Sequence, residues 1–219
     1  MDATSSLVES FALNQFICHL SCASISVLRK TSLNSAGLSV LSLGTGAEVS
    51  IDKVTSEYNS QYGYRLRGRI IRVKDSIANN NYEGIRISGE TQSSPTNVQF
   101  EGEVSSYGNT GEGIVIGEGL GEDFPSTGYF AFSKVIVKGN LKSFRNKDYG
   151  LLLEDFQSQG SEDFVVEKNG SFFSCQNGFD DIYHEDAVIF VDENPDGGYT
   201  CDSPGTTGTS LCAPCPVCA

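Results

Sequence analysis

The chain has 219 residues, with 24 glycines, no tryptophan and 38% apolar residues, a composition that fits one elongated domain with a thin core better than a thick globular one. Its formal charge of −13 argues against a nucleic-acid partner, because phosphate contacts need clustered Lys and Arg side chains. No stretch approaches the roughly 18 apolar residues that would indicate a membrane span.

Residues 1–29 precede the first clear repeat and allow two interpretations. Residues 6–9 have the form of a capping box, and apolar residues follow at helical spacing over 8–20, which predicts a short amphipathic helix. Such a helix would cap the open end of the following domain, where unpaired strand edges invite aggregation. Alternatively Ile25 and Val27 belong to a degenerate first copy of the repeat.

From residue 30 to residue 194 one pattern recurs. In its clearest copy an alternating apolar series over 98–104 leads to a turn with Ser106 and Asn109, and a second alternating run follows over 113–116. The same offsets are found at Val135, Val137, Gly139, Leu141, Ser143, Asn146 and Gly150–Leu153. Two strands joined by a Ser-x-x-Asn corner, repeated along the chain, predict a solenoid.

The anchor of each repeat is a glycine that follows an asparagine by four residues and precedes two apolar residues one apart. It is found at Asn59/Gly63, Asn80/Gly84, Asn109/Gly113, Asn146/Gly150 and, with Asp in place of Gly, Asn177/Asp181; an imperfect copy is Asn34/Gly37, where the asparagine is three residues ahead. The anchors are separated by 21 to 37 residues, and a β-solenoid tolerates this spread because insertions bulge from its corners. A leucine-rich horseshoe is disfavoured because no helical half-repeat appears.

Strand alternation assigns the core. Alternate side chains point the same way, so the pairs Ile85/Ile87, Ile114/Ile116 and Leu151/Leu153 are predicted to face inward. Stacked coils lie ~4.8 Å apart, which places each inward residue on its equivalent in the next coil. Asparagine tolerates left-handed backbone geometry, and asparagines repeated at one corner can form a hydrogen-bonded ladder. Glycine leaves room for the corner to close.

The Gly-Ile-x-Ile strand starts and the preceding Ser-x-x-Asn corners resemble those of the pectin-lyase-like superfamily, over roughly residues 30–192. The resemblance implies an all-β fold, a right-handed parallel β-helix of about six coils. It also implies that carbohydrate binds along the outward face of the Gly-Ile-x-Ile sheet. These motifs specify architecture and leave activity open.

Outward positions on that sheet are therefore the candidate ligand contacts. Arg65 and Arg86 are predicted to stack on adjacent coils with Arg67 nearby, and Tyr183 lies at the other end of the same face. Like charges directly opposite each other destabilise a sheet unless something compensates them. An acidic polysaccharide would do so, because guanidinium binds carboxylate bidentately. Pairing with nearby acids such as Glu83, or solvation, is the alternative.

The acidic end of the face supplies weak catalytic and metal candidates. Asp180, Asp181 and His184 are the catalytic ones, since paired carboxylates can hydrolyse a glycosidic bond. The metal candidates, which could hold Ca²⁺ for a lyase, are Glu154, Asp155, Glu185 and Asp186. Asp180-Asp181 matches the adjacent aspartates of the polygalacturonase-like pattern, but the Asn-Thr-Asp, Gly-His-Gly and Arg-Ile-Lys elements of that pattern are missing in the required order. A charged terminal coil that blunts edge-to-edge association is the structural alternative.

Residues 195–219 form a Gly/Ser/Thr/Pro-rich tail, which is predicted to be irregular and flexible. Its cysteines at Cys212, Cys215 and Cys218 fit either the disulfides of a secreted protein, which we favour, or zinc ligands at Cys-x-x-Cys spacing. A signal peptide is not evident, because Asp2 stands in the region that is normally basic. We expect an extracellular or cell-surface location, with the chain truncated upstream and its signal peptide missing from this sequence.

The missing catalytic motifs favour a non-catalytic extracellular or cell-surface β-helix protein. It would bind acidic polysaccharide or act as a structural scaffold, without a required cofactor and without a nucleic-acid partner. Self-association and protein partners stay open. The alternative is a divergent polysaccharide lyase, glycoside hydrolase or alginate-type epimerase, for which Ca²⁺ is the expected ion.

Overall fold

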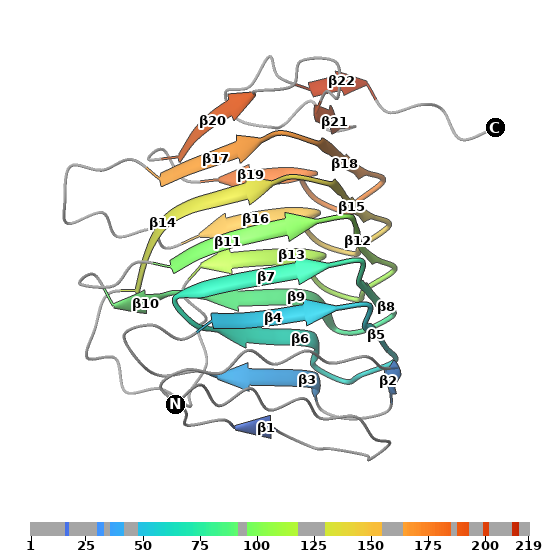
Figure 1. The fold of residues 1–219 in the computed structure, drawn as a ribbon. Coiled ribbons are helices and arrows are strands. Elements are labelled where there is room, and N and C mark those ends of the chain that lie inside the picture. Colours follow the sequence, from blue (N-terminus) through green and yellow to red (C-terminus); the bar gives the residue numbers. More distant parts are fainter. Residues whose placement is uncertain are drawn as a thin grey trace.

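The described residues form an all-β structure. The computed structural model describes residues 16–17, 30–32, 36–41, 48–91, 96–117, 130–154, 164–184, 188–192, 199–201 and 212–214. Across these ranges all helix and strand assignments are β-strands (Figure 1). No helix long and apolar enough to cross a membrane occurs in them.

The strands make three sheets. The first sheet contains, in spatial order, β1 (Phe16–Ile17), β3 (Ala36–Leu41), β6 (Tyr62–Arg67), β9 (Glu83–Ser88), β13 (Ile114–Gly117), β16 (Leu151–Glu154) and β19 (Ile182–His184). The second contains β4 (Glu48–Asp52), β7 (Ile70–Lys74), β11 (Thr96–Glu101), β14 (Phe130–Val137), β17 (Phe164–Lys168) and β20 (Val188–Asp192), with β10 (Glu90–Thr91) beside β14. The third contains β2 (Lys30–Ser32), β5 (Thr55–Glu57), β8 (Ile77–Asn79), β12 (Glu103–Tyr107), β15 (Asn140–Phe144), β18 (Ser171–Cys175), β21 (Tyr199–Cys201) and β22 (Cys212–Pro214).

The chain visits the first, second and third sheets in turn and then returns to the first, one level along the axis. Six such turns run from β3 to β21, and all pairings within the three sheets are parallel. The short strand β10 is the exception among the described strands, because it pairs antiparallel with β14. The predicted fold class is confirmed: the molecule is a right-handed parallel β-helix of five to six coils (Figure 1).

The predicted inward residues of the first sheet form its core. Ile85, Ile87, Ile114 and Ile116 are fully buried, and so is Leu153. In register, Ile85 pairs with Ile114 and Ile87 with Ile116, so like residues stack from coil to coil. This stacking removes apolar surface from water along the whole axis, at roughly 25 cal/mol per Å².

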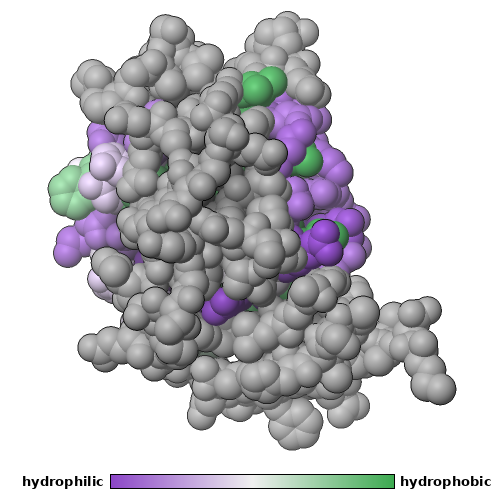
Figure 2. Space-filling model, turned by 90° about the vertical axis from the view of Figure 1, so that its left-hand side faces the viewer, coloured by the Kyte–Doolittle hydropathy of each residue, from purple (hydrophilic) through white to green (hydrophobic). Residues whose placement is uncertain are grey.

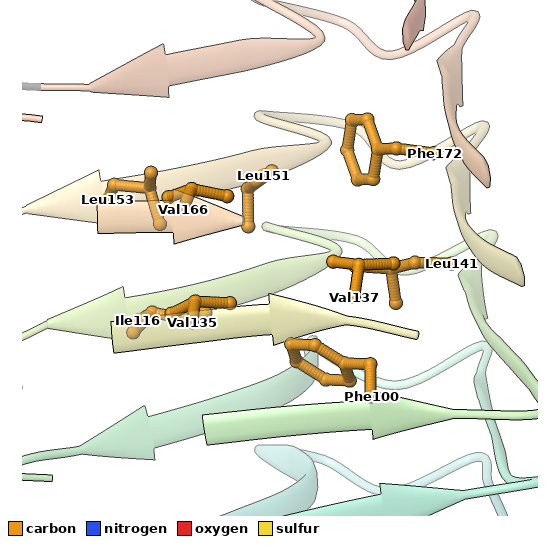
Figure 3. A pocket seen from close by; sticks show the side chains of 9 residues that line it. All are labelled: Phe100, Ile116, Val135, Val137, Leu141, Leu151, Leu153, Val166 and Phe172. Atoms are coloured by element: carbon orange, nitrogen blue, oxygen red, sulfur yellow. The ribbon is translucent and has the colours of Figure 1, made fainter. Parts of the chain in front are cut away.

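The core contains one small cavity, seen from close by in Figure 3. Its volume is about 10 Å³. It is lined by Phe100, Ile116, Val135, Val137, Leu141, Leu151, Leu153, Val166 and Phe172. An apolar space of this size stays dry, and ligand pockets are typically some 300–1,000 Å³. This cavity is therefore too small to hold a ligand.

Each coil has three strands, where the alternating pattern predicted two. The run over 98–104, expected as one strand, is divided between β11 and β12, which meet at Gly102. Gly102 has φ of 62°, a left-handed conformation that glycine adopts without steric cost. Phe100 and Val104 are both buried on either side of the bend. Every second residue still faces inward across this corner, so the alternating pattern does not show that the strand ends there.

The corner between the third and first sheets carries the predicted asparagine ladder. The ladder asparagines are Asn59, Asn81, Asn109, Asn146 and Asn177. The backbone N–H of each of the first four donates to Oδ1 of the next, at 2.9–3.2 Å. In the central coil the Asn109 Nδ2 donates to Ser106 Oγ at 3.1 Å and to Asn146 Oδ1 at 2.8 Å. Ser106 Oγ in turn donates to the carbonyl of Gly113 at 2.6 Å.

One ladder member was predicted wrongly. The sequence pattern placed Asn80 at this corner, but the structure has Asn81 there, three residues before Gly84. Asn80 instead has φ of 53°. The residue just before the ladder asparagine is also left-handed in the other coils, for example Tyr58 at 58° and Arg145 at 55°. The ladder asparagines are therefore selected for their hydrogen bonds and not for left-handed geometry.

The two chain ends continue the sheets. Phe16 and Ile17, expected within a cap helix, form β1 and pair in parallel with β3. The rest of residues 1–29 lies outside the described residues, so the domain boundary there stays a prediction. In the tail, β21 and β22 extend the third sheet, so residues 195–219 are not irregular throughout. A parallel strand that follows β18 can pair with the backbone groups along its edge, as β21 does.

Cysteine pairing is described at one position. Cys175, at the end of β18, is buried and disulfide-bonded. The side chains of Cys212, Cys215 and Cys218 lie outside the described part of the structure. The choice between disulfides and zinc for these three cysteines stays a prediction.

Candidate functional site

The outward column of the first sheet has the composition that the sequence predicted. Arg65 pairs in register with Arg86, so the two arginines stack on adjacent coils. Val115 and Leu152 occupy the next two levels and are both buried, so the column is not open to solvent there, and Tyr183 follows Leu152. The structure therefore brings Arg65 and Arg86 together but separates Tyr183 from Arg86 by two intervening strands.

Internal groups compensate the stacked arginines. Arg86 Nε donates to Glu83 Oε2 at 2.6 Å, and these side chains are only 12% and 8% exposed. The guanidinium carbon of Arg65 lies 5.5 Å, and that of Arg86 5.9 Å, from the centre of the Tyr62 ring, within the range of a cation–π contact. Arg67, one step further along β6, is 9% exposed. The alternative of pairing with Glu83 is thus what the structure has for Arg86.

The three catalytic candidates do not share one face. Asp180 is partly exposed, whereas Asp181 is completely buried. His184 pairs in register with Leu153, which belongs to the inward column, and the Nε2 atom of His184 is buried. Asp180 is therefore the partly exposed member of the adjacent aspartate pair, and His184 is partly exposed as a residue but has its Nε2 atom buried. The alternation of β19, with Tyr183 outward between two inward residues, could have shown this for His184.

Asp181 lies at the last corner of the ladder, where its hydrogen bonds are structural. It occupies the position at which earlier coils have an anchor glycine. Asn177 Nδ2 donates to Asp181 Oδ1 at 2.7 Å, and Ser174 Oγ donates to the Asp181 carbonyl at 2.7 Å. In earlier coils Nδ2 of the ladder asparagine donates to the ladder asparagine of the next coil. Here Cys201 lies opposite Ser174, in place of the serine that begins the next Ser-x-x-Asn corner. Asp181 therefore supplies the acceptor that terminates the ladder.

The metal candidates fall outside what the structure describes. The backbone of Glu154 is in β16, but its side chain is not described. Asp155, Glu185 and Asp186 lie outside the described residues altogether. Among the side chains that are described, no group of three or more His, Cys, Asp or Glu residues is arranged to hold a metal ion.

Three aromatic rings at the upper end of the first sheet form a cluster that sequence reasoning missed. We call Tyr149, Phe179 and Tyr183 the aromatic platform. The ring centre of Tyr149 lies 5.5 Å from that of Phe179 and 5.4 Å from that of Tyr183. Phe179 is 59% exposed and Tyr183 38% exposed. The signal was present in the sequence, because Tyr149 and Tyr183 both lie within two residues of an anchor position, on adjacent coils.

Carboxylates surround the platform. Partial burial raises the pKa of Tyr149 above its ordinary value, and the negative charges of Asp180 and Asp148 add to the rise. Burial likewise raises the pKa of Glu112, with Glu83 and Asp148 adding to the effect and Arg86 opposing it. The carboxylates of Asp148 and Asp180 thus lie near the Tyr149 ring of the aromatic platform.

The raised pKa of Glu112 makes a prediction for stability. Glu112→Gln is expected to raise the free energy of unfolding at pH 7 by ~0.3–0.5 kcal/mol, a small gain because solvent screens a half-buried group. The folded state resists ionisation of Glu112, so the parent protein loses stability as pH rises from the ordinary carboxyl pKa through the raised one. The glutamine variant avoids this loss.

Urea unfolding of both proteins at pH 7 and near pH 3.5 checks the prediction. The gain should disappear at the lower pH, where the carboxyl is protonated in both the folded and the unfolded states. Glu101→Gln on the second sheet, where the carboxylate pairs with Lys138, serves as the control and should not be stabilising. An equal gain at both pH values would contradict the assignment.

The remaining described surface offers a more ordinary polar face. In the side view of Figure 2, the described residues that are visible are mostly hydrophilic, with isolated hydrophobic ones among them. On the second sheet, opposite charges pair between coils: Arg72 with Glu48, Lys134 with Glu167, and Lys138 with Glu101. Exposed pairs of this kind contribute little to stability, typically under about 1 kcal/mol.

Comparison of the chain with protein-family models, with curated proteins and with solved structures returned no match. The fold and the chemistry of the described side chains are therefore the basis for a proposal about function.

Proposed function

We propose that this chain is a non-catalytic β-solenoid of the extracellular space or the cell surface that binds polysaccharide at the upper end of the outer face of its first sheet. The aromatic platform carries the proposal, because its rings are partly exposed, close together and flanked by carboxylates. Sugar rings have apolar C–H faces that pack on aromatic rings, and their hydroxyls are donors for carboxylates. Membership of the pectin-lyase-like superfamily, which the repeat resembles, is part of this proposal.

The placement of the catalytic candidates supports a binding role over an enzymatic one. Asp181 is buried and hydrogen-bonded to Asn177, and His184 is in the inward register. Acid/base hydrolysis requires two carboxyl groups that flank one glycosidic bond, and Asp180 alone of the adjacent pair is partly exposed. A divergent lyase, hydrolase or epimerase is the alternative, in which the metal candidates would act.

The prediction of an acidic polysaccharide depended on stacked arginines that have no internal partner to balance their charge. Glu83 compensates Arg86, and Tyr62 lies against both stacked guanidinium groups. Arg65 and Arg86 are both partly exposed, whereas Arg67 is buried, so an acidic polymer would contact Arg65 and Arg86 beside these internal groups. Acidic polymers are therefore included among the polysaccharides whose binding is tested.

The experiment is to measure retention of the purified protein on pectate, alginate and neutral glucans, with and without Ca²⁺, together with the size and unsaturation of the products. Retention without turnover is expected. Phe179→Ala should weaken retention about tenfold, since an exposed aromatic contact is worth on the order of 1.4 kcal/mol. Tyr58→Ala is the matched control, because Tyr58 is 57% exposed but belongs to a distant coil.

Two results would overturn the proposal. Shortened or unsaturated product, or altered alginate composition, would contradict the non-catalytic assignment. Failure to bind any polymer would contradict polysaccharide binding and leave a structural scaffold as the function.

A further inference from the structure

We propose that the outer face around the aromatic platform selects a polysaccharide that carries repeated amino groups, an amino-sugar polymer, over neutral and acidic polymers. This inference rests on the proposed polysaccharide binding and adds the charge class of the ligand. It depends on the arrangement of rings and carboxylates along successive coils.

The residue that precedes each anchor position makes a column parallel to the solenoid axis. From coil to coil the column reads Tyr62, Glu83, Glu112, Tyr149 and Asp180. Backbone hydrogen bonds establish the stacking: the N–H of Gly84 donates to the carbonyl of Glu112, that of Gly113 to Tyr149, and that of Gly150 to Asp180. The column therefore presents acids and rings at the coil spacing of about 4.8 Å.

One end of this column contains an ion pair, and among the described residues the other end contains none, although Arg86 also acts on Glu112. Glu83 is paired with Arg86 at 2.6 Å. Glu112, Asp148 and Asp180 are instead close enough to Tyr149 to raise its pKa by their negative charge. Burial and neighbouring carboxylates also raise the pKa of Glu112. A cation bound beside these groups would relieve their repulsion, whereas an anionic sugar would add to it.

Aromatic rings next to carboxylates are a recognition site for organic cations. An ammonium group is attracted to a ring face within about 6 Å and forms charge-assisted hydrogen bonds with carboxylates. The ring centres of Phe179 and Tyr183 lie 5.5 and 5.4 Å from that of Tyr149. The platform thus combines a stacking surface for a sugar ring with acceptors for its amino group.

The repeat favours a polymer over a single small cation. Acids occur in three successive coils, at Glu112, Asp148 and Asp180, so a chain that runs along the axis would meet a carboxylate at each level. A ligand with one cation per repeating unit can satisfy several of them at once, and linked contacts of this kind multiply affinity.

The test compares three oligosaccharides of equal length by calorimetric titration at low salt: glucosamine, N-acetylglucosamine and galacturonate oligomers. The glucosamine oligomer is expected to bind at least about tenfold more tightly than its neutral N-acetyl counterpart, with the difference reduced by salt. The double variant Asp148→Asn/Asp180→Asn should abolish the difference but retain weak binding of the neutral oligomer. Glu103→Gln, an exposed carboxylate on the third sheet, is the matched control and should retain it.

Four other outcomes would each overturn a stated part of the proposal. Equal affinity for the amino and N-acetyl oligomers would overturn charge selection while leaving polysaccharide binding intact. Tighter binding of galacturonate would overturn it in favour of Arg65 and Arg86. Equal affinity for an oligolysine peptide of the same charge would overturn the sugar assignment in favour of a basic protein partner. Failure of every oligosaccharide to bind would overturn the proposed function itself.

Discussion

Gly84→Ala is expected to lower the free energy of unfolding by more than about 3 kcal/mol, or to prevent folding. A Cβ at this position would lie 1.8 Å from Ser106 Oγ and 2.4 Å from the carbonyl oxygen of Gly113. Both atoms belong to the corner that follows, and the backbone oxygen cannot retreat without breaking the parallel hydrogen bond from Ile85. The space that a side chain would need is occupied by the serine and asparagine of the following corner.

Urea unfolding followed by circular dichroism measures this effect. Gly111→Ala is the matched control in the following coil, because its nearest contact would be 3.0 Å away, and it should change stability far less. Adding Ser106→Ala to Gly84→Ala removes the shortest contact but leaves Gly113 in place, so only part of the stability should return. A Gly84→Ala protein that unfolds at the same urea concentration as the parent would contradict this account of the corner.

Asn109→Ala is expected to cost about 3 kcal/mol or more. The variant loses the two donations from Nδ2, to Ser106 and Asn146, and it leaves the buried N–H of Asn81 without its acceptor. Each hydrogen bond contributes about 0.5–1.5 kcal/mol, and a buried group left unpaired costs about 1–3 kcal/mol. Because the ladder is continuous, the loss affects the coils on both sides.

Thermal unfolding of Asn109→Ala beside Thr110→Ala checks the prediction, since Thr110 is exposed and one residue away. Asp181→Asn provides a second comparison at the end of the ladder. It keeps an Oδ1 acceptor for Asn177, so it should leave stability nearly unchanged. A loss of less than about 1 kcal/mol in Asn109→Ala would mean that the ladder does not stabilise the fold.

Corner positions separate what was predictable from what was not. Ser106, Asn109 and Gly113 were predicted as one motif, and the structure shows that each supplies a group that another needs. Asn81 was missed because its coil has Ala78 where the others have serine, and because Asn80 happened to have the common spacing. The left-handed residue was also not predictable in three of the coils, since Tyr58, Arg145 and Gln176 carry no turn signal.

The candidate site was predictable only in part. Register placed Arg65 beside Arg86 correctly, because the repeat sets which residues stack. The partners of these arginines and the aromatic platform depend on side-chain conformations around the corners. Spacing allowed Glu83 as a partner of Arg86 and placed Tyr149 and Tyr183 on adjacent coils, but it did not decide either contact. The burial of Asp181 follows from the end of the ladder, a property of the next coil and not of the aspartate itself.

Sequence alone was sufficient for the solenoid architecture, the inward residues and the stacking of equivalent positions. These follow from local periodicity, which each strand carries by itself and which every coil repeats. The third strand per coil, the true ladder register, the compensation of the arginines and the acidic aromatic face required the tertiary structure. Most of these features arise from contacts between residues some 20 to 40 positions apart, which the closing of each coil on its neighbour brings together. The Glu83–Arg86 pair is local in sequence, and the side-chain conformations at the corner decide it.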